Sequence, residues 1–537
     1  MTDSTHKKER PFLPIAGALA TAVTFVLVLC FFFEPTWETN DDVAMSMVAH
    51  GYGIAATESP NLFFSNVLWG HLVRLIPEIN GVLGYSIATM ATLIVVGTVV
   101  LYGLYQMGAG LIVSLSVFVL IMVRPLLFPQ FTINAGLLMI GGIICWHLYD
   151  RQNNWRVLAM GCVLAFFSFL IRKNECLLIL IVAIPLLPWR SLFQRRSFKL
   201  ATLILLLAIT VSSVINHSAY QQERWKTFNE FNLVRASFTD FQAALHLKKR
   251  PDIFERYGFS INDIDLINSW FFAVPELNNT QNLQAMIAEL GILPWFKRGP
   301  KNFFKGLSAI WNKKVLVLFI TALLLIALRI PRRGTASLGL ILAAIFLMSL
   351  LGRPGVTRVY TPLISLLIVA PFLVSQVSVR YNKLVTGALL LATVLNCSFV
   401  FSEARKWHTN YPDIQRFSTS LPKETIVLWG ATLPLETIYS VLRASPSARS
   451  HRFYALGVFT LAPFSVAFEE EQNKIGLMDR LKSESGIPFF VNPESLEFFE
   501  KFCIEHLHSN LKEVSSEQFG KHKLRWLRCA PQVLTSK

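Results

Sequence analysis

The sequence predicts a mainly α-helical, multi-pass membrane protein of about eleven transmembrane helices, followed by a small α/β domain outside the membrane. Of its 537 residues, 53% are hydrophobic and only 16% are charged, whereas soluble domains carry about 25% charged residues. The apolar residues gather in repeated blocks of about 20 residues, the length of a membrane-crossing helix. These observations exclude a soluble enzyme, a disordered scaffold and a nucleic-acid-binding protein.

The apolar blocks predict where the membrane-spanning segments lie. The first block follows a short basic tail and is too long for a cleaved signal sequence, with no small-residue cleavage site, so we expect a retained signal-anchor helix. The blocks occupy residues 12–33, 82–106, 109–123, 131–148, 157–171, 175–188, 199–216, 314–329, 336–351, 360–376 and 384–402. The two short blocks between 157 and 188 could also form one broken hairpin.

Basic residues between the blocks predict the orientation of the chain. When the N-terminus is placed inside, the inside segments carry Lys7, Lys8, Arg10, Arg151, Arg156, Arg190, Arg195, Arg196, Lys199, Arg329, Arg332, Arg333, Arg380 and Lys383. This alternation is what the positive-inside rule requires, and anionic membrane lipids rather than nucleic acid suit a net charge of +16. We therefore expect a membrane core over residues 1–402, with outside loops at 34–80 and 217–312, and an outside α/β domain over 403–537.

The C-terminal segment alternates strand-like and helix-like patterns. Residues 424–429 and 487–491 have strand character, and a helix is predicted over 493–508 with Asn492 as its N-cap. These patterns favour a small α/β domain.

Two of the seven cysteines, Cys503 and Cys529, fall in this polar C-terminal segment. They could form a disulfide if the segment faces an oxidising compartment. The other five lie in or beside apolar blocks, where cysteine behaves as a small hydrophobic residue. No cysteine or histidine spacing suggests a zinc site or an iron–sulfur cluster.

An acidic cluster follows the first predicted span and contains Glu34, Glu38, Asn40, Asp41 and Asp42. Adjacent carboxylates at a membrane boundary repel one another and lose hydration, so they are retained where they meet a cation, a proton or a polar substrate. A structural role is also open, because Asn40 or Asp41 could cap a helix that begins at residue 43. Both roles can hold when one aspartate caps and its neighbour faces a cleft.

Five basic residues are predicted outside, against the positive-inside bias: Arg124, Arg172, Lys173, Arg353 and Arg358. Each lies at the outer end of a span, where a single arginine could extend to the lipid headgroups. Five such charges from three hairpins could instead converge on a phosphate, for which the arginine fork is well suited. An ion pair between Arg172 and Glu175 is a competing structural use.

Further polar side chains could bind a sugar or an acceptor. In the first outside loop these are His50, Glu58 and His71, of which Glu58 is the better candidate because a carboxylate can accept from a sugar hydroxyl. Tyr360 follows the late arginines and could belong to the interfacial aromatic belt instead.

These features together resemble a known class. The stretch Thr39-Asn-Asp-Asp-Val-Ala-Met-Ser-Met-Val-Ala-His-Gly-Tyr-Gly, then Asn66-Val-Leu-Trp-Gly-His-Leu, and later Gly352-Arg-Pro and Arg358-Val-Tyr-Thr-Pro, are similar to segments of the GT-C integral membrane glycosyltransferases. That class includes protein O-mannosyltransferases, oligosaccharyltransferases and the transferase that adds aminoarabinose to lipid A. The resemblance covers residues 12–402 and only weakly the C-terminal segment.

The resemblance implies an inverting glycosyltransferase of a bacterial inner membrane, with its N-terminus cytoplasmic and its C-terminal domain periplasmic. A polyprenyl-phosphate sugar would bind with its phosphate on Arg124, Arg172, Lys173, Arg353 or Arg358, and Asp41 or Asp42 would deprotonate the acceptor hydroxyl. The acceptor would be a surface glycan such as lipopolysaccharide, a lipid or a protein. Some relatives use a divalent cation, which the paired aspartates Asp41 and Asp42 would permit.

Two other functions remain open at this stage. A polysaccharide polymerase or ligase with an undecaprenyl-diphosphate donor would also need external arginines. A flippase or transporter would instead show ionisable residues near span centres and related halves. The enzyme hypothesis requires that the carboxylates near residue 41 share one outward pocket with the arginines at 353 and 358.

Overall fold

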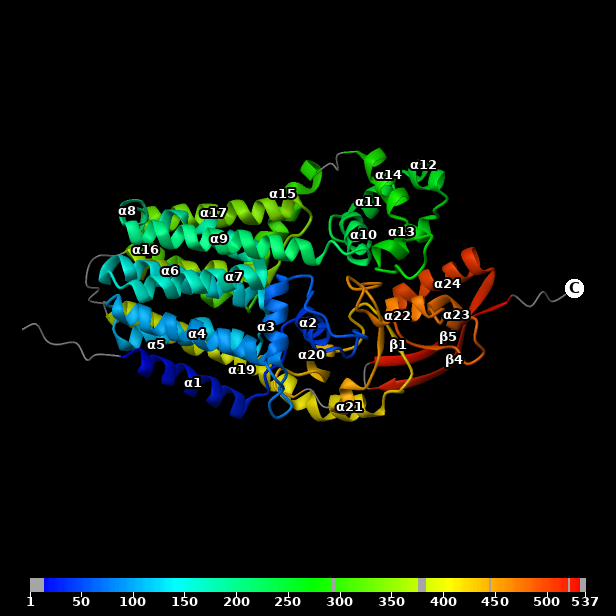
Figure 1. The fold of residues 1–537 in the computed structure, drawn as a ribbon, viewed down its shortest axis with the longest axis horizontal. Coiled ribbons are helices and arrows are strands. Elements are labelled where there is room, and N and C mark those ends of the chain that lie inside the picture. Colours follow the sequence, from blue (N-terminus) through cyan, green and yellow to red (C-terminus); the bar gives the residue numbers. More distant parts are fainter. Residues whose placement is uncertain (1–13, 292–294, 375–382, 444–445, 520–521, 532–537) are drawn as a thin grey trace, which may run out of the picture.

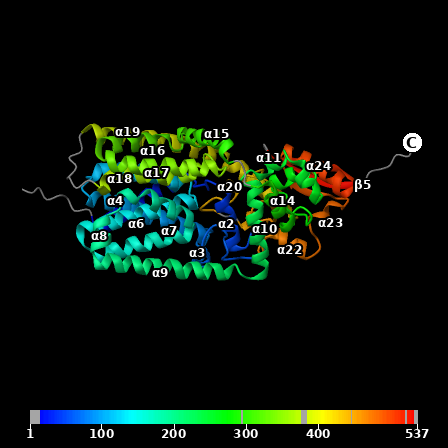
Figure 2. The same ribbon diagram turned by 90° about the horizontal axis from the view of Figure 1, so that it is seen from above.

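The computed structural model describes residues 14–291, 295–374, 383–443, 446–519 and 522–531. One half of the elongated molecule is a bundle of long helices, and the other half contains shorter helices and one sheet (Figure 1). The same division is visible from above in Figure 2. The predicted fold class, a mainly helical membrane protein with a small α/β part, is confirmed.

Eight helices among the described residues are long and apolar enough to cross a membrane, and a bent pair, Gly299–Trp311 with Leu316–Leu328, is a ninth candidate. The eight are α1 (Ile15–Phe32), α4 (Gly84–Gln106), α6 (Phe131–Gln152), α7 (Trp155–Val182), α9 (Arg196–Ala219), α17 (Pro331–Leu350), α18 (Thr357–Val374) and α19 (Lys383–Ser420). The shorter apolar helix α5 (Leu111–Leu127) and the second half of the bent pair, α16 (Leu316–Arg329), complete the bundle.

The helix α7 is broken at Arg172, whose backbone is extended (φ −155°, ψ 92°). The chain turns back there, because Cys176 Sγ lies 3.8 Å from the carbonyl oxygen of Ala165, eleven residues earlier. In a continuous helix, eleven residues span about 16 Å. The predicted blocks 157–171 and 175–188 are therefore the two arms of one hairpin. When these arms are taken separately, each predicted apolar block corresponds to a helical segment.

The loops between the helices gather at two opposite ends of the bundle. At one end, here called the inner end, Arg151 donates to the carbonyl oxygens of Met107 and Phe372. At the other, outer end, the backbone amide of Asn66 donates to the carbonyl oxygen of Leu170. The grouping agrees with the predicted inside and outside loops. The basic residues Lys7, Lys8, Arg10 and Arg380 lie outside the described residues.

Short helices cover the outer end. They are α2 (Asn40–His50), α3 (Val67–Leu75), α10 (Glu223–Thr239), α11 (Ala243–Leu247), α12 (Pro251–Phe254), η2 (Glu255–Tyr257), α13 (Ile261–Asn268), α14 (Thr280–Leu290), α15 (Trp295–Ser308) and η3 (Ala309–Trp311), while η1 (Ile184–Leu186) and α8 (Trp189–Gln194) lie at the inner end. In Figure 1, α3 lies across the ends of the long helices, and Figure 2 shows α10 carrying the chain from α9 into the extramembrane half.

The extramembrane sheet has five strands in the order β2-β1-β3-β5-β4. The strands are β1 (Ile426–Trp429), β2 (Phe453–Leu456), β3 (Ile487–Phe490), β4 (Ser509–Phe519) and β5 (His522–Pro531), and the helices between them are α20 (Leu435–Ile438), α21 (Pro446–Arg449), α22 (Val466–Gln472), α23 (Leu477–Leu481) and α24 (Pro493–Leu507). β1 is parallel to β2 and β3, and β5 is antiparallel to β3 and β4. The predicted N-cap is confirmed, since Asn492 Oδ1 accepts from the amide of Ser495 at 2.7 Å.

The sheet shares a hydrophobic core with the outside segment 217–312. The ring of Phe271 lies 4.9 Å from that of Trp429 and 5.3 Å from that of Phe502. Trp429 Nε1 also donates to the carbonyl oxygen of Ser269 at 2.6 Å. Segments that the sequence predicts as a loop and a separate domain thus pack as one extramembrane unit.

A disulfide joins Cys503 in α24 to Cys529 in β5. It closes a loop of 26 residues, and a cross-link of that size stabilises a fold mainly by restricting the unfolded chain.

We expect the double variant Cys503→Ser/Cys529→Ser to lose about 3 kcal/mol of unfolding free energy. Tryptophan fluorescence during denaturant unfolding of the detergent-solubilised protein measures this loss. The matched control is Cys30→Ser, which changes a free cysteine and should leave the stability nearly unaltered. Equal stability of the double variant and the wild type under non-reducing conditions would contradict the disulfide.

Candidate active site between the bundle and the sheet

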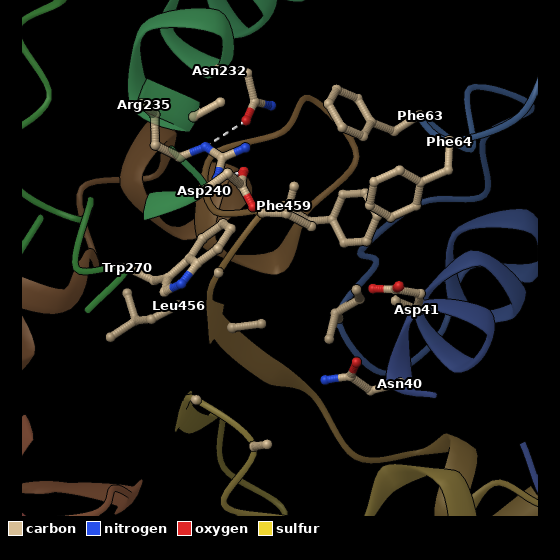
Figure 3. A pocket seen from close by; sticks show the side chains of 18 of the residues that line it. Asn40, Asp41, Phe63, Phe64, Asn232, Arg235, Asp240, Trp270, Leu456 and Phe459 are labelled. Atoms are coloured by element: carbon tan, nitrogen blue, oxygen red, sulfur yellow. Dashed lines mark hydrogen bonds and ion pairs between the residues drawn. The ribbon is translucent and has the colours of Figure 1, made fainter. Parts of the chain in front are cut away.

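A cavity of about 810 Å³ lies between the outer end of the helix bundle and the edge of the sheet. We call it the main cavity. Its polar lining includes Asn40, Asp41, Arg172, Asn229, Asn232, Arg235, Asp240, Arg353 and Arg358. Figure 3 shows that Asp41 on α2 lies on one side of it and that Arg235, Asp240 and Trp270 lie on another.

The sheet contributes the loops that follow two parallel strands. Gly430 and Ala431 follow β1, and residues 457–459 follow β2, and both loops line the main cavity. In sheets with parallel strands, ligands bind beyond the carboxyl ends of the strands, where the connecting loops diverge. Gly430 has a φ of +76°, a conformation that glycine adopts without strain.

The helix α2 places Asp41 toward the main cavity. It begins at Asn40, one turn earlier than predicted, and its N-cap position is Thr39. The predicted capping by Asn40 or Asp41 is therefore wrong. Asp41 instead accepts a hydrogen bond from Arg358 Nη1 at 2.8 Å, so the two predicted charge clusters are in contact.

Asp42 faces away from the cavity and is fully buried. Its Oδ1 accepts from the backbone amide of Phe131 at 2.9 Å and from the Tyr85 hydroxyl at 3.1 Å. Burial, together with the neighbouring charge of Asp41, raises the pKa of Asp42 to about 8. These contacts fix α2 against the first residue of α6 and against α4, so Asp42 positions Asp41.

Two arginines, Arg358 and Arg172, line the main cavity together with Asp41. Arg358 stands in the first turn of α18. Arg172 stands at the break in α7, where Nη1 donates to the carbonyl oxygen of Phe64 at 3.3 Å. The Arg172 guanidinium also lies over the rings of Phe64 and Phe131, at 5.3 and 5.2 Å, an arrangement that favours the cation.

A second charged cluster lies on another wall. Asp240 Oδ1 is 3.1 Å from Arg353 Nη2, and Asp240 Oδ2 is 3.6 Å from Arg235 Nη1. The Arg235 guanidinium lies 4.4 Å from the ring centroid of Trp270. Arg353 and Arg358 are close in sequence and both line the main cavity, but they pair with different aspartates, Asp240 and Asp41.

A side cavity of about 530 Å³ adjoins the main cavity between the outer ends of α7 and α9. Both cavities are lined by Phe63, Phe64, Arg172 and Asn229. Lys173 lines the side cavity but not the main cavity. Polar side chains of α9, such as Asn216, line the side cavity with it. Arg172 can thus contact a ligand in either space.

Arg124 lies outside the lining of both cavities. Its guanidinium pairs with Glu38 and Glu403, each at 2.7 Å, and Lys314 also pairs with Glu38 at 2.6 Å. A buried arginine held by two carboxylates has its charge satisfied. The structure therefore gives Arg124 the role of joining α5, α19 and the acidic cluster rather than access to a phosphate in the cavity.

The four acceptor-binding candidates are likewise absent from the lining of the main cavity. His50 Nε2 accepts from the amide of Tyr85, and burial lowers its pKa. Glu58 pairs with Arg74 at the surface, and His71 is exposed. The Tyr360 hydroxyl donates to the carbonyl oxygen of Gly306. These four candidates therefore do not share the main cavity with Asp41.

Sequence reasoning missed a group of residues in the segment 217–312: Asn229, Asn232, Arg235, Asp240 and Trp270. The available signal was the mixture of charged and aromatic residues in a long outside segment. That signal equally describes helices on a membrane surface, and only the packing of α10 against the sheet distinguishes the two.

No metal-ligand pair is formed by the two predicted aspartates, because Asp41 and Asp42 bind different partners. Within the described ranges, the one group of carboxylates and histidines close enough to hold a metal is Asp263, Glu505 and His506, whose ligand atoms lie within 4.8 Å of one another. These three residues do not line the main cavity.

Two solved structures are similar to this chain. ArnT from Cupriavidus metallidurans bound to undecaprenyl phosphate has 11% identity and a TM-score of 0.38, over 96% of this chain and 97% of its own. The apo state of the same protein has 11% identity and a TM-score of 0.41, over 95% and 98%. No family model matches the sequence, and no curated relative matches it. At this identity and these TM-scores, the likeness carries no argument about the function of this chain.

The raised pKa of Asp42 predicts a pH-dependent stability. Because the folded-state pKa of about 8 exceeds the usual value of 3.8, folding favours the protonated form, and its stabilisation is lost as the pH rises from about 4 through 8. We expect Asp42→Asn to gain stability relative to wild type by about 1 kcal/mol per pH unit in this window.

Unfolding free energies measured in detergent at pH 5, 6, 7 and 8 for the two proteins test this expectation. Glu58→Gln, which changes an exposed carboxylate, is the control and should run parallel to wild type. A constant difference between Asp42→Asn and wild type across the series would show that Asp42 titrates normally.

Proposed function

We propose that the protein is an inverting membrane glycosyltransferase that moves a sugar from a polyprenyl-phosphate donor to a surface glycan, lipid or protein acceptor. The observation that carries this proposal is the ion pair formed by Asp41 and Arg358 in the main cavity. Arg172 lines the same cavity. A carboxylate and two guanidinium groups in one pocket supply a proton acceptor and an anion site together.

Asp41 is proposed as the general base. The acceptor hydroxyl oxygen attacks the anomeric carbon, its proton passes to a carboxylate oxygen of Asp41, and the bond from the anomeric carbon to the phosphate oxygen breaks. Attack from the face opposite the phosphate inverts the anomeric configuration. The products are the glycosylated acceptor and polyprenyl phosphate, and no step requires a redox partner or a metal ion.

Arg358 and Arg172 are proposed to bind the departing phosphate. The phosphate gains negative charge as the glycosidic bond breaks, so fixed cations beside it lower the barrier. In the absence of substrate Arg358 is held by Asp41 at 2.8 Å. A phosphate that takes over this guanidinium would release the Asp41 carboxylate for the acceptor hydroxyl.

The side cavity and Lys173 are proposed to bind the polyprenyl-phosphate end of the donor. The side cavity lies where α7 and α9 reach the outer end of the bundle, and α9 exposes apolar side chains such as Leu203 and Leu207 along its length. A polyprenyl chain could lie against that face with its phosphate near Lys173 and Arg172. The phosphate-binding set that these positions support is Arg172, Lys173 and Arg358; Arg124 lies outside both cavities, and Arg353 pairs with Asp240 on another wall.

The proposed location is a bacterial inner membrane with the main cavity on the periplasmic side. Arg151 and Arg195 lie at the inner end, which the positive-inside rule places in the cytoplasm. The disulfide between Cys503 and Cys529 lies in the extramembrane half, and disulfides persist in oxidising compartments. Both observations support the same orientation.

The position of the charges supports an enzyme over a transporter. A transporter binds its substrate near the middle of the membrane, on broken helices that meet there. In this chain the charged lining of the main cavity comes from the outer ends of α7 and α18 and from the extramembrane segments.

We expect Asp41→Asn to abolish sugar transfer, with a loss of about a hundredfold or more, because loss of a general base costs that much. Surface glycans of a strain that lacks the gene, complemented with each variant, are compared by mass spectrometry. Asp42→Asn should retain transfer, since its hydrogen bonds can be made by an amide. Glu58→Gln is the matched control for a carboxylate outside the cavity. Normal surface glycans in the strain with Asp41→Asn would contradict the role of Asp41 as the general base.

We expect Arg358→Ala to lower kcat/KM for the lipid-linked donor by about tenfold or more, since a charge-assisted bond to phosphate is lost. Transfer assays with membranes and varied donor concentrations measure the change. Arg74→Ala, which removes an arginine paired with Glu58 outside the cavity, is the control. An unaltered donor dependence in Arg358→Ala would count against phosphate binding.

A further inference from the structure

A group of charged, amide and aromatic side chains lies on one wall of the main cavity. It consists of Asn232 and Arg235 on α10, Asp240 after it, Trp270, and Arg353. We call this group the distal cluster. Figure 3 shows Asn232, Arg235, Asp240 and Trp270 close together and apart from Asp41.

The distal cluster contains a buried donor without a partner. The Asn232 amide is nine-tenths buried or more, and Nδ2 has no hydrogen-bond partner within the described residues. The amide orientation is fixed, because Arg235 Nε can only donate and lies 2.7 Å from Asn232 Oδ1. The unpaired donor is therefore the NH₂ group, at a residue that lines the main cavity.

The charges of the distal cluster do not balance. Two guanidinium groups, those of Arg235 and Arg353, share the single carboxylate of Asp240 at 3.6 and 3.1 Å. Burial lowers the pKa of Arg235 to about 10, with Asp240 opposing that shift and Arg353 adding to it. A ligand that brings one negative charge would neutralise the cluster and accept from the free amide.

The ring of Trp270 adds an apolar surface. Its backbone φ is +70°, a strained conformation for a bulky residue. The strain is held by the neighbours of Trp270 on both sides, since Ser269 accepts from Trp429 Nε1 and Phe271 packs against the same Trp429 ring. An aromatic face attracts the C–H bonds of a sugar ring through its quadrupole, so Trp270 beside an anion site favours an acidic sugar.

We infer that the distal cluster is the acceptor subsite and that it binds a saccharide carrying a phosphate or carboxylate group. The role of the bound saccharide as the acceptor rests on the proposed function. Binding of the saccharide can be measured without sugar transfer. Such an acceptor would be held by Trp270, Asn232, Arg235 and Arg353 while its reacting hydroxyl extends toward Asp41.

Binding of four soluble probes to the full-length protein in neutral detergent tests the inference. The probes are glucose 6-phosphate, glucuronate, glucose and inorganic phosphate, followed by calorimetry and by saturation-transfer NMR of the sugar protons. We expect both acidic sugars to bind, glucose to bind about tenfold more weakly or worse, and inorganic phosphate to bind more weakly than glucose 6-phosphate. If glucose bound as tightly as glucose 6-phosphate, the site would not require an anionic group and the inference would fail. If inorganic phosphate bound as tightly, the site would not require a sugar ring and the inference would also fail.

Variants locate the site. Asn232→Asp replaces the free donor by an acceptor and should weaken glucose 6-phosphate binding about tenfold, whereas Asn229→Asp, one turn earlier in α10 and also lining the cavity, makes the same change in charge and should weaken it much less. Arg353→Gln, at a side chain that is half exposed, and Trp270→Ala keep the test valid if Asn232→Asp fails to fold. Binding that is unaffected by Arg353→Gln and Trp270→Ala would overturn the assignment.

Two further outcomes separate this inference from the proposed function. If a short-chain polyprenyl phosphate displaces glucose 6-phosphate competitively, the distal cluster is a donor site and the inference fails while the enzyme stands. If Asp41→Asn retains full transfer but acidic sugars still bind at the distal cluster, the proposed base fails while the binding site stands.

Discussion

The structure depends on the way four carboxylates in one short segment bind four different parts of the chain. Glu34 accepts from Ser440 of the extramembrane half, and Glu38 pairs with Arg124 and Lys314. Asp41 pairs with Arg358, and Asp42 holds the start of α6. Removing one member of a buried ion pair leaves the other charge unsatisfied, so the pair of Glu38 with Arg124 ties the segment to α5. The bonds of Asp42 to Phe131 and Tyr85 then hold α2 beside the cavity.

The contrast between Asp41 and Asp42 follows from helix geometry. Successive residues of a helix are rotated by about 100°, so adjacent side chains on α2 cannot face the same space. One carboxyl is then buried against Phe131 and Tyr85, while the other meets an arginine in the cavity. A pair of adjacent acids thus provides one buried anchor and one carboxylate that faces the cavity, and the anchor determines where the second carboxylate lies.

Much of the fold could be predicted because it is encoded locally. The length of the apolar blocks predicted the helical segments, including both arms of α7. Asn492 predicted the start of α24, because asparagine is a common N-cap residue. Within the site, Asp41, Arg172, Arg353 and Arg358 were predicted, since charges at the outer ends of spans stand out against apolar sequence. Arg124 has the same sequence signature and could not be distinguished, because its partner Glu403 is 279 residues away. Asn232, Arg235 and Trp270 were missed because a tertiary contact with the sheet, not a local pattern, places them in the cavity.

The core shared by the segment 217–312 and the sheet has a consequence for how the protein is made. Trp429 is translated 160 residues after Ser269, to which it donates, and four membrane helices, α16, α17, α18 and α19, are inserted in between. At about 5–20 residues per second, the aromatic face around Phe271 would wait roughly 10–30 s for its partner. During that interval it is an exposed hydrophobic surface, so this half of the molecule is the part in which a chaperone would be needed during biogenesis.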